Sequence, residues 1–131
     1  CFTYKGKWLI QKRSEGDIWS GLYQFYLIEN TALPIIASAY IEQVCGDQLG
    51  IKPSQIAEGF NLKASDKTKV SVVYHQTLTH QLIQARFIKI ELVILPTIFN
   101  NALLVNAKQM SKFPFPKIVN DFLTTQFEKW T

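Results

Sequence analysis

Alternating apolar and polar positions dominate the first quarter of the chain and predict β-structure there. Apolar side chains alternate in residues 2–4, and residues 8–10 resume the apolar pattern after a polar break at 5–7. Two such runs around a short glycine-containing break are typical of a β-hairpin. Residues 14–17 have turn composition, and the aromatic run at 22–28 predicts a further strand.

The period of the pattern changes after Pro34 and becomes helical. Apolar residues recur at positions i, i+3, i+4 and i+8, namely Ile41, Val44, Cys45 and Leu49. Ser38 stands where an N-cap is needed, and Gly50 stands where a helix commonly ends. The sequence therefore predicts an amphipathic helix over residues 38–49.

The second half of the chain returns to an extended pattern and ends in a helix. Residues 60–62, 70–74 and 82–95 have strand patterns, with a polar turn at 65–68. The tail carries apolar residues at three- and four-residue spacing behind Pro114 and Pro116, namely Ile118, Val119, Phe122, Leu123, Phe127 and Trp130. This order of elements predicts an α+β fold, an α/β sandwich in which a mixed β-sheet packs between helices.

Length and composition bound the class of protein. The 131 residues, 47% of them hydrophobic, suit one globular domain and exclude a disordered chain. The longest apolar stretch, residues 88–99, is interrupted by two charged residues and a proline, whereas a bilayer span takes roughly 20 apolar residues. The chain opens at Cys1 without a methionine or a secretory signal, so we expect a fragment of a longer protein. Cys1 and Cys45 are too isolated for a disulfide framework or a metal site, which favours a reducing cytoplasm.

Motifs of nucleotide chemistry are missing from the sequence. Its six glycines form no G-x-G-x-x-G or Walker pattern. The nearest acid pairs are Glu15 with Asp17 and Asp121 with Glu128. Neither is a convincing acid and base pair, and the first lies in a predicted turn, where solvated acids are ordinary.

Both histidines, His75 and His80, fall in one polar segment. In a continuous strand their separation of five residues places them on opposite faces, which makes a poor metal pair. If residues 76–79 form a loop instead, the polar side chains of residues 77–81 converge on a planar ligand such as a base edge. A half-buried strand with a hydrogen-bonded histidine is the more ordinary structure for this composition.

The positive charge is modest and spread along the chain. The formal net charge is +4, and the basic residues form three clusters, Lys5/Lys7/Lys12/Arg13, Lys63/Lys67/Lys69 and Lys108/Lys112/Lys117. Lysine and arginine gain affinity for phosphate backbones by releasing counterions. Scattered lysines more commonly form a solvated face, so charge alone is compatible with nucleic-acid binding without requiring it.

Three segments together resemble one known family. Residues 17–25 read Asp-Ile-Trp-Ser-Gly-Leu-Tyr-Gln-Phe, residues 75–80 read His-Gln-Thr-Leu-Thr-His, and residues 113–116 read Phe-Pro-Phe-Pro before the final helix. In order and spacing they are similar, over nearly the whole chain, to the C-terminal domain of the MutY family of adenine DNA glycosylases. Gln24 and Tyr26 depart from the family pattern, in which Glu and Pro are usual.

The resemblance implies a MutT/Nudix-like fold, in agreement with the predicted sandwich. An active Nudix hydrolase holds a divalent metal through a G-x5-E-x7-R-E-x-x-E-E-x-G box. The matching helix, residues 38–50, lacks the Arg-Glu and Glu-Glu pairs of this box and retains only Glu42 and Asp47. These two residues lie roughly 140° apart on a helix of 3.6 residues per turn. We therefore expect no metal-dependent phosphate hydrolysis by this chain.

The resemblance also implies a function for residues 1–131 as a single recognition domain. The parent enzyme removes adenine paired with 8-oxoguanine or guanine, and this domain contacts the 8-oxoguanine without catalysing the cleavage. The family's recognition loop maps onto Leu78, Thr79 and His80. Leu78 would wedge against the bases, Thr79 would hydrogen-bond the altered Hoogsteen edge, and His80 would add a directional contact. Leu78 stands where some relatives have an aromatic residue, so stacking is lost.

Partners follow from the same resemblance. They are double-stranded DNA with an 8-oxoguanine:A mispair and the chain's own N-terminal catalytic domain, which would carry a helix-hairpin-helix and a 4Fe-4S cluster. Lys63, Lys67 and Lys69 are candidate contacts to the DNA backbone. We expect a monomer in the bacterial cytoplasm, associated with the nucleoid through DNA, with no membrane contact and no cofactor or metal of its own.

Two other functions stay open on the sequence. One is a free-standing Nudix-like nucleotide hydrolase that uses Glu42 and Asp47. The other is a protein-interaction module whose exposed aromatic residues dock a partner such as a replication clamp.

Overall fold

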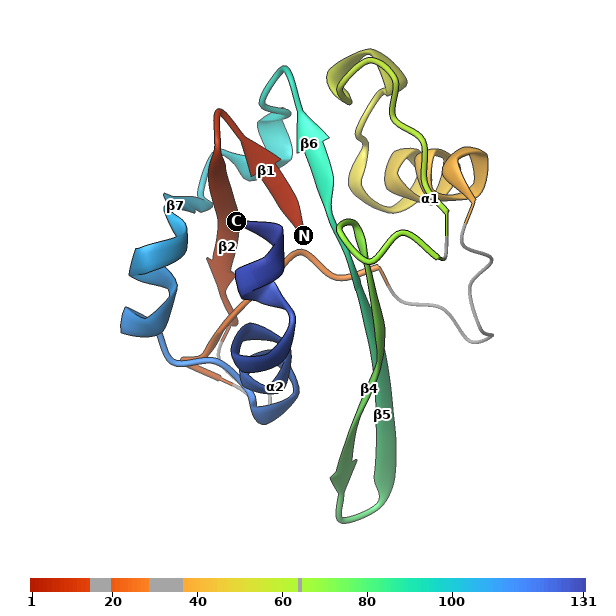
Figure 1. Ribbon diagram of the computed structural model, residues 1–131. Helices are drawn as coiled ribbons and strands as arrows, with labels where there is room; N and C mark the ends of the chain where they lie inside the picture. The colour runs from red at the N-terminus through yellow and green to blue at the C-terminus, as the bar shows by residue number, and fades with distance from the viewer. Residues whose placement is uncertain (15–19, 29–36, 64) are drawn as a thin grey trace.

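A computed structural model of the protein describes residues 1–14, 20–28, 37–63 and 65–131. Within these ranges the strands are β1 (Phe2–Tyr4), β2 (Lys7–Lys12), β3 (Tyr23–Gln24), β4 (Val70–Leu78), β5 (Gln81–Ile88), β6 (Ile90–Leu92) and β7 (Leu103–Val105) (Figure 1). The α-helices are α1 (Ser38–Leu49) and α2 (Lys117–Thr125), and the 3-10 helices are η1 (Pro53–Gln55), η2 (Thr97–Phe99), η3 (Ala107–Lys112) and η4 (Phe127–Trp130). Most of the turn predicted at 14–17, including both members of the Glu15/Asp17 pair, lies outside the described residues.

The main sheet is mixed and has the order β3-β2-β1-β6, with β7 also paired to β2. β1 and β6 run parallel, whereas β2 is antiparallel to β1, β3 and β7. The predicted hairpin of β1 and β2 is confirmed. Its turn is made by Lys5 and Gly6 at φ of 50° and 76°, the left-handed backbone that a two-residue hairpin turn of this kind requires.

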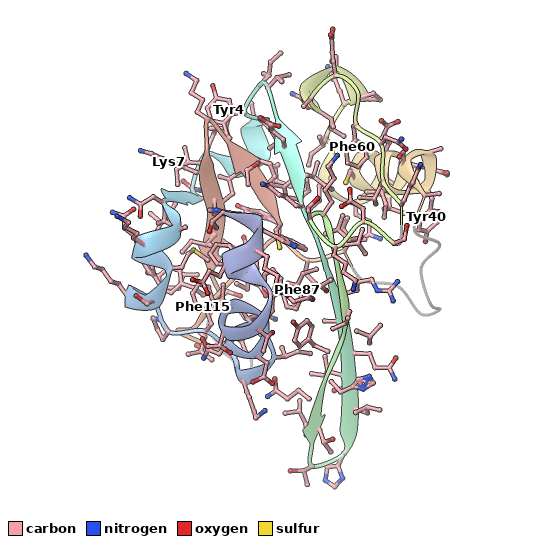
Figure 2. The ribbon with its side chains drawn as sticks, in the orientation of Figure 1. Tyr4, Lys7, Tyr40, Phe60, Phe87 and Phe115 are labelled. Atoms are coloured by element: carbon pink, nitrogen blue, oxygen red, sulfur yellow. The ribbon has the colours of Figure 1, made fainter. Side chains whose placement is uncertain are left out.

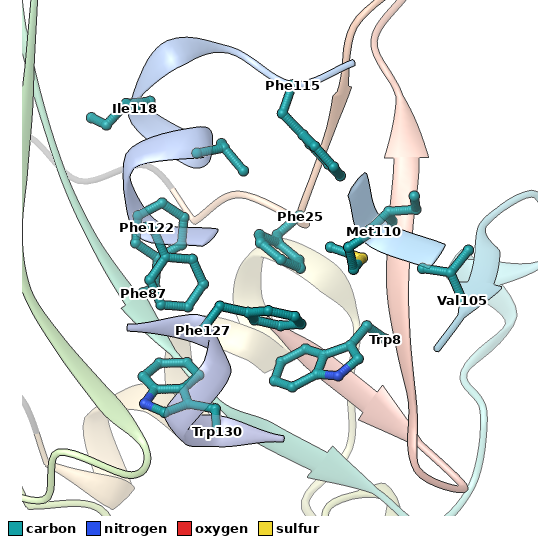
Figure 3. Packing of buried hydrophobic residues seen from close by; sticks show 12 residues of the cluster. Trp8, Phe25, Phe87, Val105, Met110, Phe115, Ile118, Phe122, Phe127 and Trp130 are labelled. Carbon is teal, nitrogen blue, oxygen red and sulfur yellow. The ribbon is translucent and has the colours of Figure 1, made fainter. Parts of the chain in front are cut away.

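Two hydrophobic cores lie on the two faces of this sheet. Successive residues of β2 point to opposite faces, so that Trp8 and Ile10 enter the first core and Leu9 enters the second. α2 and η4 cover the first core, which Figure 3 shows, and α1 covers the second. The predicted α+β sandwich, with a mixed sheet between helices, is therefore confirmed.

Helix α1 has the predicted bounds but begins differently from the prediction. Gly50 ends it at φ 66°, with its N–H bonded to the carbonyls of the last turn. The N-cap is Ala37, without a side-chain cap, so the prediction for Ser38 is wrong. The Ser38 hydroxyl instead accepts a hydrogen bond from the Leu62 N–H at 2.6 Å, because the chain around residue 62 packs beside the start of the helix.

Three predicted strands differ in extent from the prediction. The strand expected at 22–28 is confined to β3, because only Tyr23 and Gln24 pair with β2; Phe25, the next residue, is buried in the first core. Residues 60–62 form no strand. The strand expected at 82–95 is interrupted at Lys89, whose N–H bonds the Lys69 carbonyl before the chain crosses from the β4 partner to the β1 partner. The final helix is split into α2 and η4.

β4 and β5 form a separate two-stranded hairpin that extends beyond the sandwich (Figure 1). A bulge between Val70 and Val73 interrupts the pairing near its base. There the buried Ser71 hydroxyl accepts a hydrogen bond from the Phe87 N–H at 2.7 Å. This bond satisfies an N–H group that the bulge removes from the ladder.

Candidate functional site

The far end of the β4–β5 hairpin brings together the three residues that the resemblance singled out. Leu78 pairs with Gln81 and closes the ladder, and Thr79 and His80 form the two-residue turn. Both turn residues are exposed and Leu78 is half-buried. We call Leu78, Thr79 and His80 the tip. The loop envisaged over 76–79 is wrong, because β4 continues through Leu78.

The two histidines lie far apart along this hairpin. His75 is three residues before the end of β4, or roughly 10 Å at 3.3 Å per residue. It pairs across the ladder with Gln84 and is exposed. His75 and His80 are therefore not placed to bind one ion together. The sequence predicted this for a continuous strand, whereas in the structure His75 lies within β4 and His80 lies in the turn.

The β4–β5 hairpin, residues 70–88, which we call the arm, has one face toward α2 and one face toward solvent. Alternate residues of β4, Tyr74 and Gln76, are half-buried on the α2 side, whereas His75 and Thr77 point outward and are exposed. On β5, Arg86 is also exposed. Residues 70–88 contain no Asp or Glu. The outward face therefore exposes hydrogen-bonding groups and a guanidinium to solvent, without a carboxylate from residues 70–88 that would repel phosphates.

Hydrogen bonds join the base of the arm to the rest of the domain, which we call the body. The Tyr74 hydroxyl lies 2.6 Å from the Thr125 hydroxyl of α2, and Gln126 accepts from the Val72 N–H at 3.0 Å. The ring of Tyr74 also meets Phe87 and Phe122 of the first core edge to face. The arm is thus built into the same core that holds α2.

The lysines proposed as backbone contacts lie at the other end of the arm. Lys63 and Lys67 are exposed and Lys69 is half-buried, just before the start of β4. Nine residues of β4 separate them from the tip, roughly 30 Å in an extended chain. Lys69 lines a hollow of about 220 Å³ with Lys89 and Lys129, but Glu58 and Glu91 line it as well. The structure therefore does not gather the lysine cluster and the tip into one site.

A turn held by Asp66 orders the segment that carries these lysines. Its carboxylate accepts from the Thr68 N–H at 3.0 Å and from the Thr68 hydroxyl at 2.6 Å. These bonds to Thr68 lower the pKa of Asp66. The predicted polar turn at 65–68 is thereby confirmed.

A second hollow, of about 650 Å³, lies at the end of α1 beside β2 and β3. The polar side chains of its described lining are amides, cations and one phenol: Gln11, Lys12, Arg13, Gln24, Gln48, Asn101 and Tyr26. The Arg13 guanidinium donates to the Gln24 side-chain oxygen. No carboxylate of the described residues lines this hollow. Mg²⁺ is held in proteins by carboxylates together with water and phosphate oxygens, and the described part of this lining supplies none of those carboxylates.

The acids that the structure describes do not assemble elsewhere either, whereas Glu15 and Asp17 lie outside the described residues. On α1, Glu42 is half-buried and Asp47 is exposed. Asp121 is bound to Lys117 at 3.0 Å, an ion pair within one turn of α2, rather than to Glu128. Across the described ranges, no group of three or more His, Cys, Asp and Glu side chains is placed to hold a metal ion.

Sequence reasoning missed Gln76 and Arg86. Arg86 is one of only two arginines, and its place opposite Val73 on the outward face follows from strand register alone. Gln76 shares one face of β4 with Tyr74 and Leu78, so the two-residue period of a strand could have indicated that it faces the body. No local pattern in the sequence indicates its hydrogen-bond partner, Ile118, which follows 42 residues later.

The fold and the hairpin define a class of small α+β domain built on a mixed sheet between two helical layers. A model of the NUDIX domain matches residues 1–125, so the chain belongs to the NUDIX domain family. No curated protein matches the chain. In the part of the chain that the structure describes, the helices are too short or too polar to cross a membrane.

Proposed function

We propose that this chain is a DNA-lesion recognition domain that reads 8-oxoguanine opposite adenine with the tip of its β4–β5 hairpin. The observation that carries the proposal is the position of Thr79 and His80, exposed in the turn of an acid-free arm that extends beyond the body (Figure 1). A base within a duplex is reached most readily by a narrow projecting element, and a two-stranded ribbon fits the major groove.

The chemistry of the tip suits this lesion. Oxidation converts the N7 acceptor of guanine into an N–H donor, and the Thr79 hydroxyl has lone pairs to accept from it. His80 offers a donor or an acceptor at each ring nitrogen. Leu78, at the end of the ladder, is an apolar side chain of the kind that wedges between base steps.

The donor set near α1 argues for binding rather than hydrolysis. Amides, cations and the Tyr26 hydroxyl are the polar groups in the described lining of that hollow, and Glu42 and Asp47 are not joined by a third acid in the described residues. On this proposal the adenine is removed by a separate catalytic domain of a MutY-type glycosylase, with a 4Fe-4S cluster, and the present domain contributes selectivity for the opposite base.

Equilibrium binding to short duplexes tests the proposal. Fluorescence anisotropy would compare duplexes with one central 8-oxoguanine:A, G:A or G:C pair at one fixed salt concentration, since affinities for DNA depend steeply on salt. We expect tighter binding to the 8-oxoguanine duplex. Thr79→Ala and His80→Ala should each reduce that preference about tenfold, as expected for a specific base contact worth roughly 1–3 kcal/mol.

The chain supplies matched controls on the same arm. Thr77→Ala and His75→Ala remove the same side-chain types from exposed positions of β4 away from the turn, and should leave the preference unchanged. Equal binding of the wild-type chain to all three duplexes would refute the proposal. Mg²⁺-dependent hydrolysis of an 8-oxo-purine triphosphate, abolished in Glu42→Gln, would favour the nucleotide hydrolase instead.

A further inference from the structure

Helix α2 is capped at its N-terminus by a side chain from the hairpin. The residue at the N-cap is Pro116, which makes no side-chain cap. The Ile118 N–H in the first turn donates instead to the Gln76 side-chain oxygen of β4 at 3.0 Å. The amide of Gln76 thus takes the place that a serine or aspartate side chain commonly fills at a helix start.

This bond joins the arm to a rigid part of the molecule. Ile118, Val119 and Phe122 of α2 are all buried in the first core. The first-turn N–H groups of a helix have no partner within the helix, and the positive end of the helix dipole favours an acceptor there. Removal of the Gln76 oxygen would leave the partly buried Ile118 N–H without its acceptor, so the contact resists opening.

Gln76 is also placed to act on the tip. It lies two residues before Leu78 and on the same face of β4. The other bonds between β4 and α2 or Gln126, made by Val72 and Tyr74, lie nearer the base. In the described part of the chain, Gln76 is the hydrogen-bonded attachment of β4 to the body that is nearest the turn.

We propose that Gln76 is a positioning residue, which fixes the direction of the recognition tip by tying the distal half of the hairpin to the N-terminus of α2. A two-stranded ribbon bends and twists more the further it extends beyond its last attachment, whereas recognition of one altered base edge needs atoms held to a fraction of an ångström. The structural part of this inference stands alone, and its consequence for DNA rests on the proposed function.

Three variants separate positioning from general stability. Gln76→Ala removes the acceptor, and Gln76→Glu keeps an oxygen that accepts from the Ile118 N–H and suits the helix dipole. Gln84→Ala is the matched control, because Gln84 is an exposed glutamine on the outward face of the same hairpin. All three would be studied as the full chain.

The first measurement needs no DNA. NMR order parameters and hydrogen exchange would follow the amides of Thr79, His80 and Ile118. We expect Gln76→Ala to lower the order parameters of both tip residues and to speed exchange at Ile118 about fivefold, as expected when one ordinary hydrogen bond is removed. Gln76→Glu and Gln84→Ala should keep wild-type values. Unchanged dynamics in Gln76→Ala would overturn the inference.

The second measurement is the preference for the 8-oxoguanine duplex over the G:A duplex. We expect it to fall about fivefold in Gln76→Ala and to be retained in Gln76→Glu and Gln84→Ala. If the tip loosens but the preference persists, Gln76 does not set recognition, and its role in it is refuted. If the tip loosens and the wild-type chain itself shows no preference, the positioning role is supported and the proposed function fails.

Discussion

Cys45 lies fully buried in the second core, where its surroundings control its ionisation. Burial raises the pKa of its thiol from 9.0 to about 11. The unfolded thiol therefore ionises near pH 9 while the folded thiol stays neutral, so its contribution to stability is present below pH 9 and disappears between pH 9 and 11.

The corresponding prediction concerns the pH dependence of unfolding. The urea midpoint of the wild-type chain should fall more steeply from pH 8 to pH 10.5 than that of Cys45→Ala, because only the wild type carries the buried thiol. Titration of lysines and tyrosines is common to both chains and cancels in the difference. Parallel pH profiles of the two chains would show that the thiol ionises equally in both states.

For single residues, the hydrogen-bond partners of side chains were the least predictable feature. Ser38 was expected to cap its own helix and instead bonds the Leu62 N–H, while α2 is capped by Gln76 rather than by a neighbour. Such bonds join residues 24 and 42 positions apart, so local pattern carries no trace of them. The adjacency of Leu78, Thr79 and His80 could be predicted because they are consecutive.

Among the elements, α1 contains one glycine, Gly46, and ends at a second, Gly50, and the two should respond oppositely to alanine. Gly50 has φ 66° and no atom near an added Cβ, so Gly50→Ala should destabilise the fold by about 1 kcal/mol through backbone strain alone. Gly46 lies inside the helix, and its added Cβ would meet the Ile51 carbonyl at an ordinary 3.6 Å.

Gly46→Ala should therefore stabilise the chain by up to about 1 kcal/mol, because alanine loses less backbone freedom on folding. Denaturant unfolding of both variants measures the two signs. A stabilising Gly50→Ala would mean that the left-handed end of α1 is wrong.

The segment before β4 carries a separate prediction about DNA. Replacing both Lys63 and Lys67 with Gln should weaken binding equally for lesion and undamaged duplexes. It should also lower the slope of log affinity against log salt by about 0.9 for each phosphate that the protein no longer neutralises. These residues lie roughly 30 Å from the tip, which is about nine base pairs at 3.4 Å each.

Duplex length then provides the internal check. The effect of the lysine changes should vanish on duplexes that end within about five base pairs of the lesion on both sides, since those cannot span the distance. Lys108→Gln, an exposed lysine in η3, is the matched control. A changed preference between lesion and undamaged DNA would place these lysines at the recognition site instead.

Element type was predictable where one period ran unbroken, as in α1. Prediction of the element type failed where strand pairing decided which residues form a strand. Residues 22–28 are aromatic and favour strand, yet in the described part of the chain only Tyr23 and Gln24 of this run pair with β2. The run at 82–95 is divided because one part pairs with β4 and the other with β1.

For the whole molecule, the first core joins the sheet, α2 and the base of the hairpin through Phe122. Its side chain is fully buried, and its ring stacks on that of Phe87 with centroids 4.1 Å apart. Figure 3 shows the two rings overlapping, as expected for this stacked pair. Phe122→Ala should cost about 3–5 kcal/mol, because it leaves a cavity and removes these ring contacts.

Phe122→Leu is the matched variant that keeps most of the volume, and it should cost distinctly less. Thermal and urea unfolding measure both, with tryptophan fluorescence reporting on Trp8 and Trp130 of the same core. A destabilisation below about 1 kcal/mol for Phe122→Ala would contradict the packing described.

The sandwich as a whole could be predicted from the alternation of strand and helix patterns, and the family match agrees with it. The course of the hairpin beyond the body could not (Figures 1 and 2). It depends on contacts of Tyr74 and Gln76 with a helix more than 40 residues later in the chain. The three residues of the candidate site therefore stay a prediction from the sequence, whereas the projecting arm that carries them could not be predicted.

Amide chemical-shift mapping with a short 8-oxoguanine:A duplex tests the central proposal most directly, because it reports where on the molecule the lesion is felt. The difference between shifts caused by the 8-oxoguanine duplex and by an otherwise identical G:A duplex should be largest at Leu78, Thr79 and His80. It should be small along the hollow at the end of α1. Lesion-dependent shift changes concentrated around Gln48 and Gln24, without changes in the hairpin, would contradict the proposal.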